Sequence, residues 1–336
     1  MDLELTPEQR ELRTVAADFL ARRVEPDVLW QELRELGWYE VGLEEDDPFG
    51  IPGLCLIAEQ QGRNLAFTLL VDVAVIARVT PCDAPYALAV LEQGGSWDPE
   101  QLETTVTGDG RVDGVKLAVR HGAEAAGFGV IALRDGEPVL ALVAAGAPGV
   151  EITSVEGVDA GAHVTRVRFD SAPAVTVVAD ADAIARALRV GAVATAAEAV
   201  GAAAQALDLA IAYAGEREQF GRPIGRFQAV QHLLSEAHVL RDTAWSSCLF
   251  AAAALDEDHE DATESAAVAK AYAARAAREV TELALQVFGG VGFTEEHDLH
   301  LHLRRVLDCE QRFGGAGHHE ARLVTQLAGR LAEVAR

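Results

Sequence analysis

Apolar residues recur at helical spacing from the start of the chain. The segment Thr6-Pro7-Glu8-Gln9 contains a Thr N-cap, a Pro in the first turn and a Gln three residues after the cap. These residues predict a capping box at a helix start, because the Thr and Gln side chains can each bind a backbone N–H of the first turn. The same spacing predicts further helices at 27–36, 54–62 and 66–79.

The pattern changes after Pro81, where short apolar runs alternate with Gly, Pro and Asp. Residues 108–114 are dense in turn formers. Short runs separated by such residues are typical of a small β-barrel or sandwich. The predicted strands are 87–91, 104–107, 115–119, 129–133, 139–143, 164–169 and 175–178.

From Asp180 onward the chain is rich in Ala, has little Pro, and again shows long helical patterns. Ala-rich faces allow helices to pack closely, so we expect a four-helix bundle that also buries a face against another subunit. The predicted fold is mainly α with a central β domain: an N-terminal helical domain (1–80), a middle β domain (81–179) and the C-terminal bundle (180–336). The predicted helices of the bundle region are 184–214, 227–256, 263–288, 295–309 and 318–335.

Composition limits the classes of partner. The 336 residues carry a formal net charge of -25, which argues against nucleic acid or an anionic membrane, since both attract a basic face. Half of the residues are hydrophobic, yet no uncharged apolar run is long enough to predict a membrane span. The acidic N-terminus lacks an apolar export segment, and the four cysteines form no CxxC pair, so we expect a cytoplasmic protein with reduced thiols.

The segment 212–231, AYAGEREQFGRPIGRFQAVQ, combines two helical patterns with an interruption at Gly221 and Pro223. These two residues predict a tight turn between the helices. Arg217 and Phe220 are then expected at the end of the first helix and Gln228 at the start of the second. A guanidinium, an aromatic ring and an amide are together suited to a phosphate group and a planar base.

This segment, YAxxRxQFGxPIxxFQxVQ, resembles the signature of the acyl-CoA dehydrogenase family, flavoproteins that desaturate acyl-CoA thioesters. Residues 286–293, QVFGGVGF, are similar to the second flavin segment of that family. The resemblance implies an acyl-CoA substrate and an FAD cofactor that is bound mainly by a neighbouring subunit. It also implies that the ADP half of FAD is held by Arg217, Phe220, Gln228, Gln286, Gly289 and Gly290.

The sequence departs from the family pattern where a catalytic base is expected. Desaturation requires a carboxylate that removes the α-proton of the substrate. By resemblance, that Glu lies in a turn before the last helix, which is Gly314 here, or at the start of the long helix, which is Gly191. Glu310 lies four residues from the first position and is the alternative candidate, although a surface carboxylate is the simpler interpretation.

Three hypotheses remain open at this point. The chain resembles the short, base-lacking subunits of actinobacterial heteromeric acyl-CoA dehydrogenases that act on steroid or other bulky acyl-CoAs, and it would then form a heterotetramer with a homologous subunit. It could also be a self-associating enzyme that uses Glu310, or an inactive scaffold of the same fold. His297, His300 and His302 with Asp298 have a metal-like composition, but a helix would place 297 and 302 on different faces, so no metal is expected.

Overall fold

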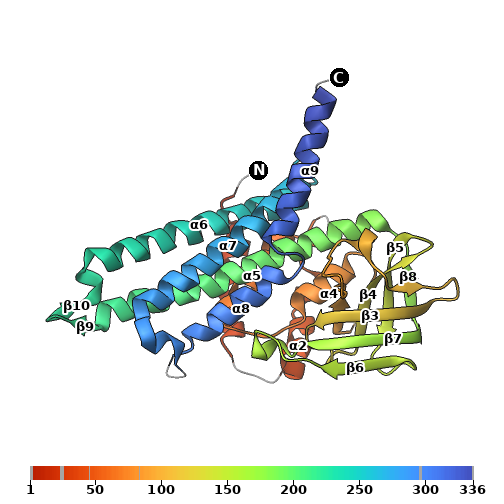
Figure 1. The fold of residues 1–336 in the computed structure, drawn as a ribbon, viewed down its shortest axis with the longest axis horizontal. Helices are drawn as coiled ribbons and strands as arrows, with labels where there is room; N and C mark the ends of the chain where they lie inside the picture. Colours follow the sequence, from red (N-terminus) through yellow and green to blue (C-terminus); the bar gives the residue numbers. More distant parts are fainter. Residues whose placement is uncertain (1–2, 23–25, 45, 83, 295–296, 335–336) are drawn as a thin grey trace. The chain divides into compact units, whose positions relative to one another are not determined.

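A computed structural model describes residues 3–22, 26–44, 46–82, 84–294 and 297–334. The chain forms two compact units (Figure 1). The helical unit consists of Met1–Arg23, Asp46–Ala66 and Ala192–Arg336, and the sheet unit of Val24–Glu45 and Phe67–Gly191. Both units are therefore discontinuous in sequence, and the three domains with boundaries at 80 and 179 stay a prediction.

Long helices build the helical unit, and the longest of them, α5, begins in the sheet unit. The expected capping box is present at α1, where Thr6 and Gln9 exchange backbone to side-chain hydrogen bonds. The predicted helix at 295–309 begins at Leu299; residues 295 and 335, which the sequence placed in helices, lie outside the described residues. The helices are α1 (Pro7–Leu20), α3 (Gly50–Arg63), α5 (Ala181–Glu216), α6 (Gln228–Asp256), α7 (Ala262–Phe288), α8 (Leu299–Gln311) and α9 (Ala316–Val334).

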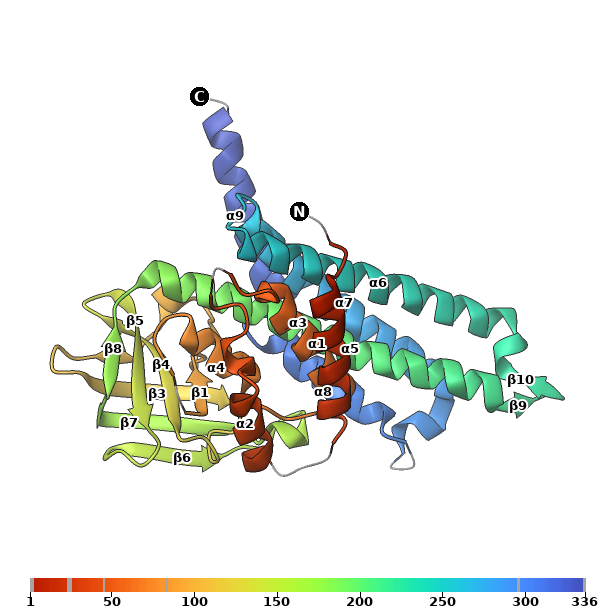
Figure 2. The ribbon, with the colours of Figure 1, turned by 180° about the vertical axis from the view of Figure 1, so that it is seen from behind.

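Small residues form the centre of the bundle. Ala202 of α5, Ala237 of α6, Ala277 of α7 and Cys309 of α8 belong to one buried cluster, so these four helices meet as predicted. Side chains of this size let helix axes approach closely. The helix α1 packs on α3, and α3 also contacts α6 and α8 (Figure 2).

Buried charges are paired across the bundle. Arg305 of α8 donates to Glu198 of α5 at 3.1 Å and to the carbonyl of Ala66 at 3.0 Å, and both charged side chains are almost fully buried. Glu59 of α3, also buried, accepts two hydrogen bonds from Arg13 of α1. Because an unpaired buried charge is costly, these pairs require the helices to keep one register.

By length and composition α5 is capable of crossing a membrane, contrary to the expectation that no segment is. The apolar window of this helix is 94% buried inside the protein, which is usual for a core helix. The finding therefore carries little weight as evidence for a membrane span.

The sheet unit contains an eight-stranded, curled sheet in the order β6-β7-β3-β2-β4-β5-β8, with β1 paired to β4 (Figure 1). The strand β4 pairs in parallel with β1 and β2, and the other pairs are antiparallel. The helices are α2 (Pro26–Glu35) and α4 (Leu70–Ala77), and the strands are β1 (Tyr86–Ala89), β2 (Thr105–Val106), β3 (Arg111–Val119), β4 (Gly127–Arg134), β5 (Glu137–Ala144), β6 (Val150–Ser154), β7 (Thr165–Pro173) and β8 (Thr176–Val178).

Three local predictions were wrong in the sheet unit. The expected turn at 108–114 is shorter, because β3 begins at Arg111. The helix α4 begins at Leu70 rather than at 66, after a turn in which the Thr68 hydroxyl accepts from the Leu70 N–H at 3.0 Å. The strand β6 was missed because it lies at the edge of the sheet and is mostly exposed, and so has no strong apolar pattern.

A buried ion pair joins β3 to the loop that follows β1 in the sheet unit. Lys116 of β3 donates to the Glu92 carboxylate at 2.6 Å, and Glu92 also accepts from the Thr104 N–H at 3.0 Å. Burial lowers the pKa of Lys116 to about 8, while Glu92 acts in the opposite direction. Burial would raise the pKa of Glu92, but the hydrogen bond from Lys116 leads the contacts that hold it below its usual value. The Glu92 carboxylate therefore has a structural role in the sheet unit.

Candidate cofactor site at the end of the helical bundle

The predicted tight turn between α5 and α6 is a short β-hairpin. The strands β9 (Glu218–Gln219) and β10 (Arg222–Pro223) pair across Phe220 and Gly221, which have φ angles of 54° and 77°. Two consecutive residues in the left-handed region are typical of a type I′ turn, and Gly is favoured there. Phe220 thus lies at the tip of a hairpin, not at a helix end as expected.

The aromatic ring of Phe220 is 94% exposed. Its nearest aromatic neighbour is Phe227, edge-on at 6.2 Å between ring centroids. The Arg222 guanidinium stacks on the Phe227 ring, 4.2 Å from its centroid. The sequence analysis did not single out Arg222. Arg217 follows α5 and Gln228 opens α6, and both side chains are exposed. The three side chains that are expected to contact a phosphate and a base are therefore all accessible to a ligand.

The two segments of the sequence signature meet at the same end of the bundle (Figure 1). Tyr213 of α5 stacks on Phe288 of α7 with ring centroids 4.2 Å apart and planes 11° apart. Ile224 and Val230, from the first segment, pack on the cluster that contains Phe288, and Val291 joins them from the second. Residues about 70 positions apart are thus joined by one apolar contact.

The second segment exposes Gln286, Gly289 and Gly290 beside this contact. Gly289 ends α7 with φ 67° and ψ -149°, a backbone conformation that is nearly restricted to glycine. A Cβ at Gly290 would meet no atom of the described residues within 4 Å, so no contact among them requires glycine there. An accessible backbone at Gly290 fits close approach of a ligand or a second chain.

These residues fit the ADP half of a dinucleotide. The exposed Phe220 ring can stack on a base, the exposed Arg217 can pair with phosphate oxygens, and the exposed backbone at Gly290 allows close approach. All six expected residues are on the surface, where a ligand or a second chain can reach them.

A polar cavity of about 440 Å³ lies beneath the second segment. Arg63 lines it and donates to Asp208 at 2.6 Å and to Gln205 at 3.1 Å. His302 also lines it and is 3% exposed, and burial lowers the pKa of this imidazole to about 4. His302 is therefore neutral near pH 7, and the Arg63 guanidinium is paired with the Asp208 carboxylate.

Comparison with known proteins finds the same family that the two sequence segments resemble. The family profile described as "Acyl-CoA dehydrogenase, C-terminal domain" matches residues 181–326. The chain is 32% identical over 290 residues to acyl-CoA dehydrogenase FadE34 of Mycobacterium tuberculosis, covering 85% of this chain and 40% of that protein. The chain belongs to the acyl-CoA dehydrogenase family. The family is one of oxidoreductases.

Solved structures of the family extend the likeness over nearly the whole chain. A variant of the Tcur3481-Tcur3483 steroid ACAD superposes with a TM-score of 0.86 at 28% identity and covers 97% of this chain and 99% of its own. The ChsE4-ChsE5 complex from Mycobacterium tuberculosis gives a TM-score of 0.85 at 25% identity and covers 98% and 99%. The chain spans only 40% of the length of FadE34, however, so activity, substrate and partners are treated below as proposals.

The family's usual base position, Gly314, cannot be filled by a side chain without rearrangement. The residue has φ 94°, and a Cβ there would lie 2.6 Å from His318 Cδ2 and 3.2 Å from His319 Nε2. His319 is held in place by a 2.9 Å hydrogen bond to the Phe313 carbonyl, and burial lowers its pKa to about 4. Histidine rings thus occupy the space that a Glu side chain would need.

Glu310 lies on α8 in contact with α7. Its side chain is 15% exposed, and one carboxylate oxygen faces the Arg278 guanidinium at 3.9 Å. The backbone carbonyl of Glu310 accepts from Lys270 at 3.2 Å, and Cys309 O accepts from the same ammonium at 2.5 Å. Burial lowers the pKa of Lys270 to about 8. These contacts fit a residue that orders the end of α8. The other base position, Gly191, is buried within α5.

The histidines after α7 do not gather around one point. The His300 ring bonds the His297 carbonyl at 3.0 Å, and His297, Asp298 and His302 line the polar cavity without forming a group with metal-ligand spacing among the described residues. Across the described ranges, the group of three with metal-ligand spacing is instead His121, Glu124 and His163 in the sheet unit. The sequence analysis missed it because its two histidines are 42 positions apart and belong to no motif.

Proposed function

We propose that the chain is a subunit of a heteromeric acyl-CoA dehydrogenase that contributes FAD-binding residues but no catalytic base. One combination of observations supports this most strongly. Both flavin segments are intact and exposed at one end of the bundle, while the family's base position is a glycine enclosed by His318 and His319. A protein that had lost flavin altogether would have no reason to keep Arg217, Phe220 and Gln228 together.

The role proposed for each residue follows from the chemistry of its side chain. Arg217 would bind the pyrophosphate, Phe220 would stack on adenine, and Gln228 and Gln286 would donate to polar groups of the ADP half. Bound FAD supplies the acceptor for the hydride that leaves the β-carbon. The α-proton must then be removed by a carboxylate of the second subunit, because Glu310 is already engaged at the end of α8.

The surface of the bundle also favours a partner chain. Large apolar side chains are exposed on α6, α7 and α9, where a monomer gains nothing from them. Two of the structural relatives carry the names of two proteins each, Tcur3481-Tcur3483 and ChsE4-ChsE5. A related subunit that covers these helices is the partner we propose. The exposed side chains are Val239, Phe250, Val268, Val324 and Leu327.

Replacement of Arg217 by Ala tests the FAD assignment. In the complex formed with a base-bearing homologue, Arg217→Ala should weaken FAD binding by about one to two decades, since a charge-assisted hydrogen bond contributes roughly 1.5–3 kcal/mol. The fold should be unaffected because the side chain is exposed. FAD affinity is measured by fluorescence titration of the apo complex, and the melting temperature of each apo variant is recorded.

Arg304→Ala is the matched control, because Arg304 is also an exposed Arg of the helical unit but belongs to neither flavin segment. Its FAD affinity should equal that of the wild type. Unchanged FAD affinity in Arg217→Ala, or equal weakening in both variants, would remove Arg217 from the FAD site.

A further inference from the structure

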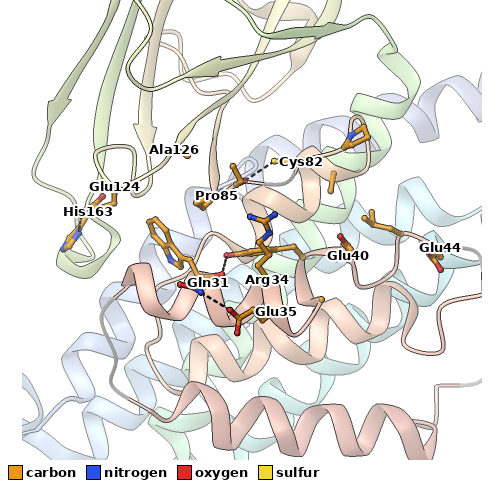
Figure 3. Close-up of a pocket in the computed structure, with 17 residues that line it drawn as sticks. Gln31, Arg34, Glu35, Glu40, Glu44, Cys82, Pro85, Glu124, Ala126 and His163 are labelled. Carbon is orange, nitrogen blue, oxygen red and sulfur yellow. Dashed lines mark hydrogen bonds and ion pairs between the residues drawn. The ribbon is translucent and has the colours of Figure 1, made fainter.

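Two loops of the sheet unit bring His121, Glu124 and His163 together. Each residue offers one ligand atom, and the three atoms lie within 4.8 Å of one another. His163 and Glu124 lie side by side, with His163 Nδ1 2.6 Å from Glu124 Oε1 (Figure 3). The ring centroids of His121 and His163 are 5.7 Å apart. We propose that these three side chains bind a divalent transition-metal ion of the Zn²⁺ class.

The donor set suits such an ion. Two neutral imidazoles and one carboxylate are the ligands of many three-residue zinc sites, in which a fourth position stays open. Two ligands of a tetrahedral zinc ion are about 3.3 Å apart, given bond lengths near 2.0–2.1 Å. Glu124 and His163 must therefore separate by less than about 1 Å, and both side chains are partly exposed and able to move.

The backbone holds the two loops in one arrangement. His121 and His163 have φ angles of 52° and 41°, which are uncommon for a residue with a side chain. The His121 N–H donates to the Ala162 carbonyl at 3.2 Å, so the loops are bonded to each other. A Cβ at Gly122 would overlap the Thr165 hydroxyl, so a glycine is needed at this corner. Strained residues that are fixed in this way are frequent at binding sites.

The third ligand, His121, is positioned by its neighbours. Its ring is 1% exposed and packs edge-on against Trp30 at 5.6 Å and Phe67 at 6.1 Å between centroids. Packing of this kind fixes the direction of a ligand before the metal arrives.

Glu124 and His163 also line a cavity of about 1330 Å³ within the sheet unit (Figure 3). Residues of α2 line the same cavity, among them Trp30, Gln31 and Arg34. The open position of the metal ion would thus face a space large enough for water or a small ligand.

A Co²⁺ titration of the purified full chain, free of any affinity tag, tests the site. We expect one Co²⁺ per chain with visible d–d absorption, and displacement of Co²⁺ by Zn²⁺. His163→Ala and Glu124→Gln should each weaken binding by about 100-fold or more, because each removes one of three metal–ligand bonds. Both side chains are partly exposed, so the variants should fold, as a thermal melt verifies.

His259→Ala is the matched control, since His259 lies 3.7 Å from the Asp261 carboxylate but belongs to no group of three among the described residues. Co²⁺ binding should be the same as in the wild type. The site is overturned if the wild type binds no stoichiometric Co²⁺, if binding survives either ligand substitution, or if His259→Ala weakens it equally.

Discussion

Supplied with excess FAD but with no other protein, the chain is expected to leave acyl-CoA substrates of every chain length unoxidised. Loss of a positioned general base costs on the order of 10²–10⁴ in rate, and the weakly acidic α-proton favours the upper end of this range. Addition of a base-bearing homologue should restore turnover. The measurement is reduction of an artificial electron acceptor by the chain alone, the homologue alone and the mixture.

Two variants make this assay specific. Glu310→Gln should leave the activity of the mixture unchanged, because Glu310 contacts Arg278 on the neighbouring helix. Gly314→Glu should not create activity in the chain alone, since φ is 94° there and the His318 ring occupies the position of the side chain. Strong turnover by the chain alone that Glu310→Gln abolishes would support a self-sufficient enzyme with a displaced base and contradict the proposal.

Glu198→Ala should be the most destabilising single substitution of the bundle. It removes the carboxylate that accepts from Arg305 at 3.1 Å in a fully buried position, and so takes an ion-pair partner away from a buried guanidinium. Breaking a buried pair in this way costs roughly 3–5 kcal/mol of unfolding free energy. The change is measured by urea unfolding of the apo protein.

Glu282→Ala is the control, because Glu282 pairs with Arg278 at the surface with i,i+4 spacing. A pair of this kind contributes about 0.3–0.5 kcal/mol. A loss below about 1 kcal/mol in Glu198→Ala would show that Arg305 finds enough compensation elsewhere, and the pair would then not determine the register of the bundle.

The sequence predicted the elements that have a strong local cause. The capping box at Thr6 and the long Ala-rich helices follow from spacing and composition alone, and the structure has them within a few residues. Phe220 was predicted at a helix end but lies at a hairpin tip. Gly221 and Pro223 predict a turn, but they do not predict that two short strands pair beside it. The exposed edge strand β6 was missed since it buries little apolar surface.

The candidate site was predictable only in part. Two sequence motifs predicted the cofactor residues. The contact between the two motifs through Tyr213 and Phe288 could be seen only in the structure. Nothing in the sequence signals that His318 fills the space beside Gly314, because that depends on how α9 begins. The cluster of His121 and His163 likewise arises from two loops that only the sheet brings together.

The visible absorption spectrum shows whether the chain holds FAD only together with a second subunit. The chain is purified once alone and once after co-expression with a base-bearing homologue, and bound flavin is measured per chain. We expect flavin absorbance, together with a complex of both proteins, only in the second preparation. A chain purified alone as a monomer with one tightly bound FAD would contradict this expectation.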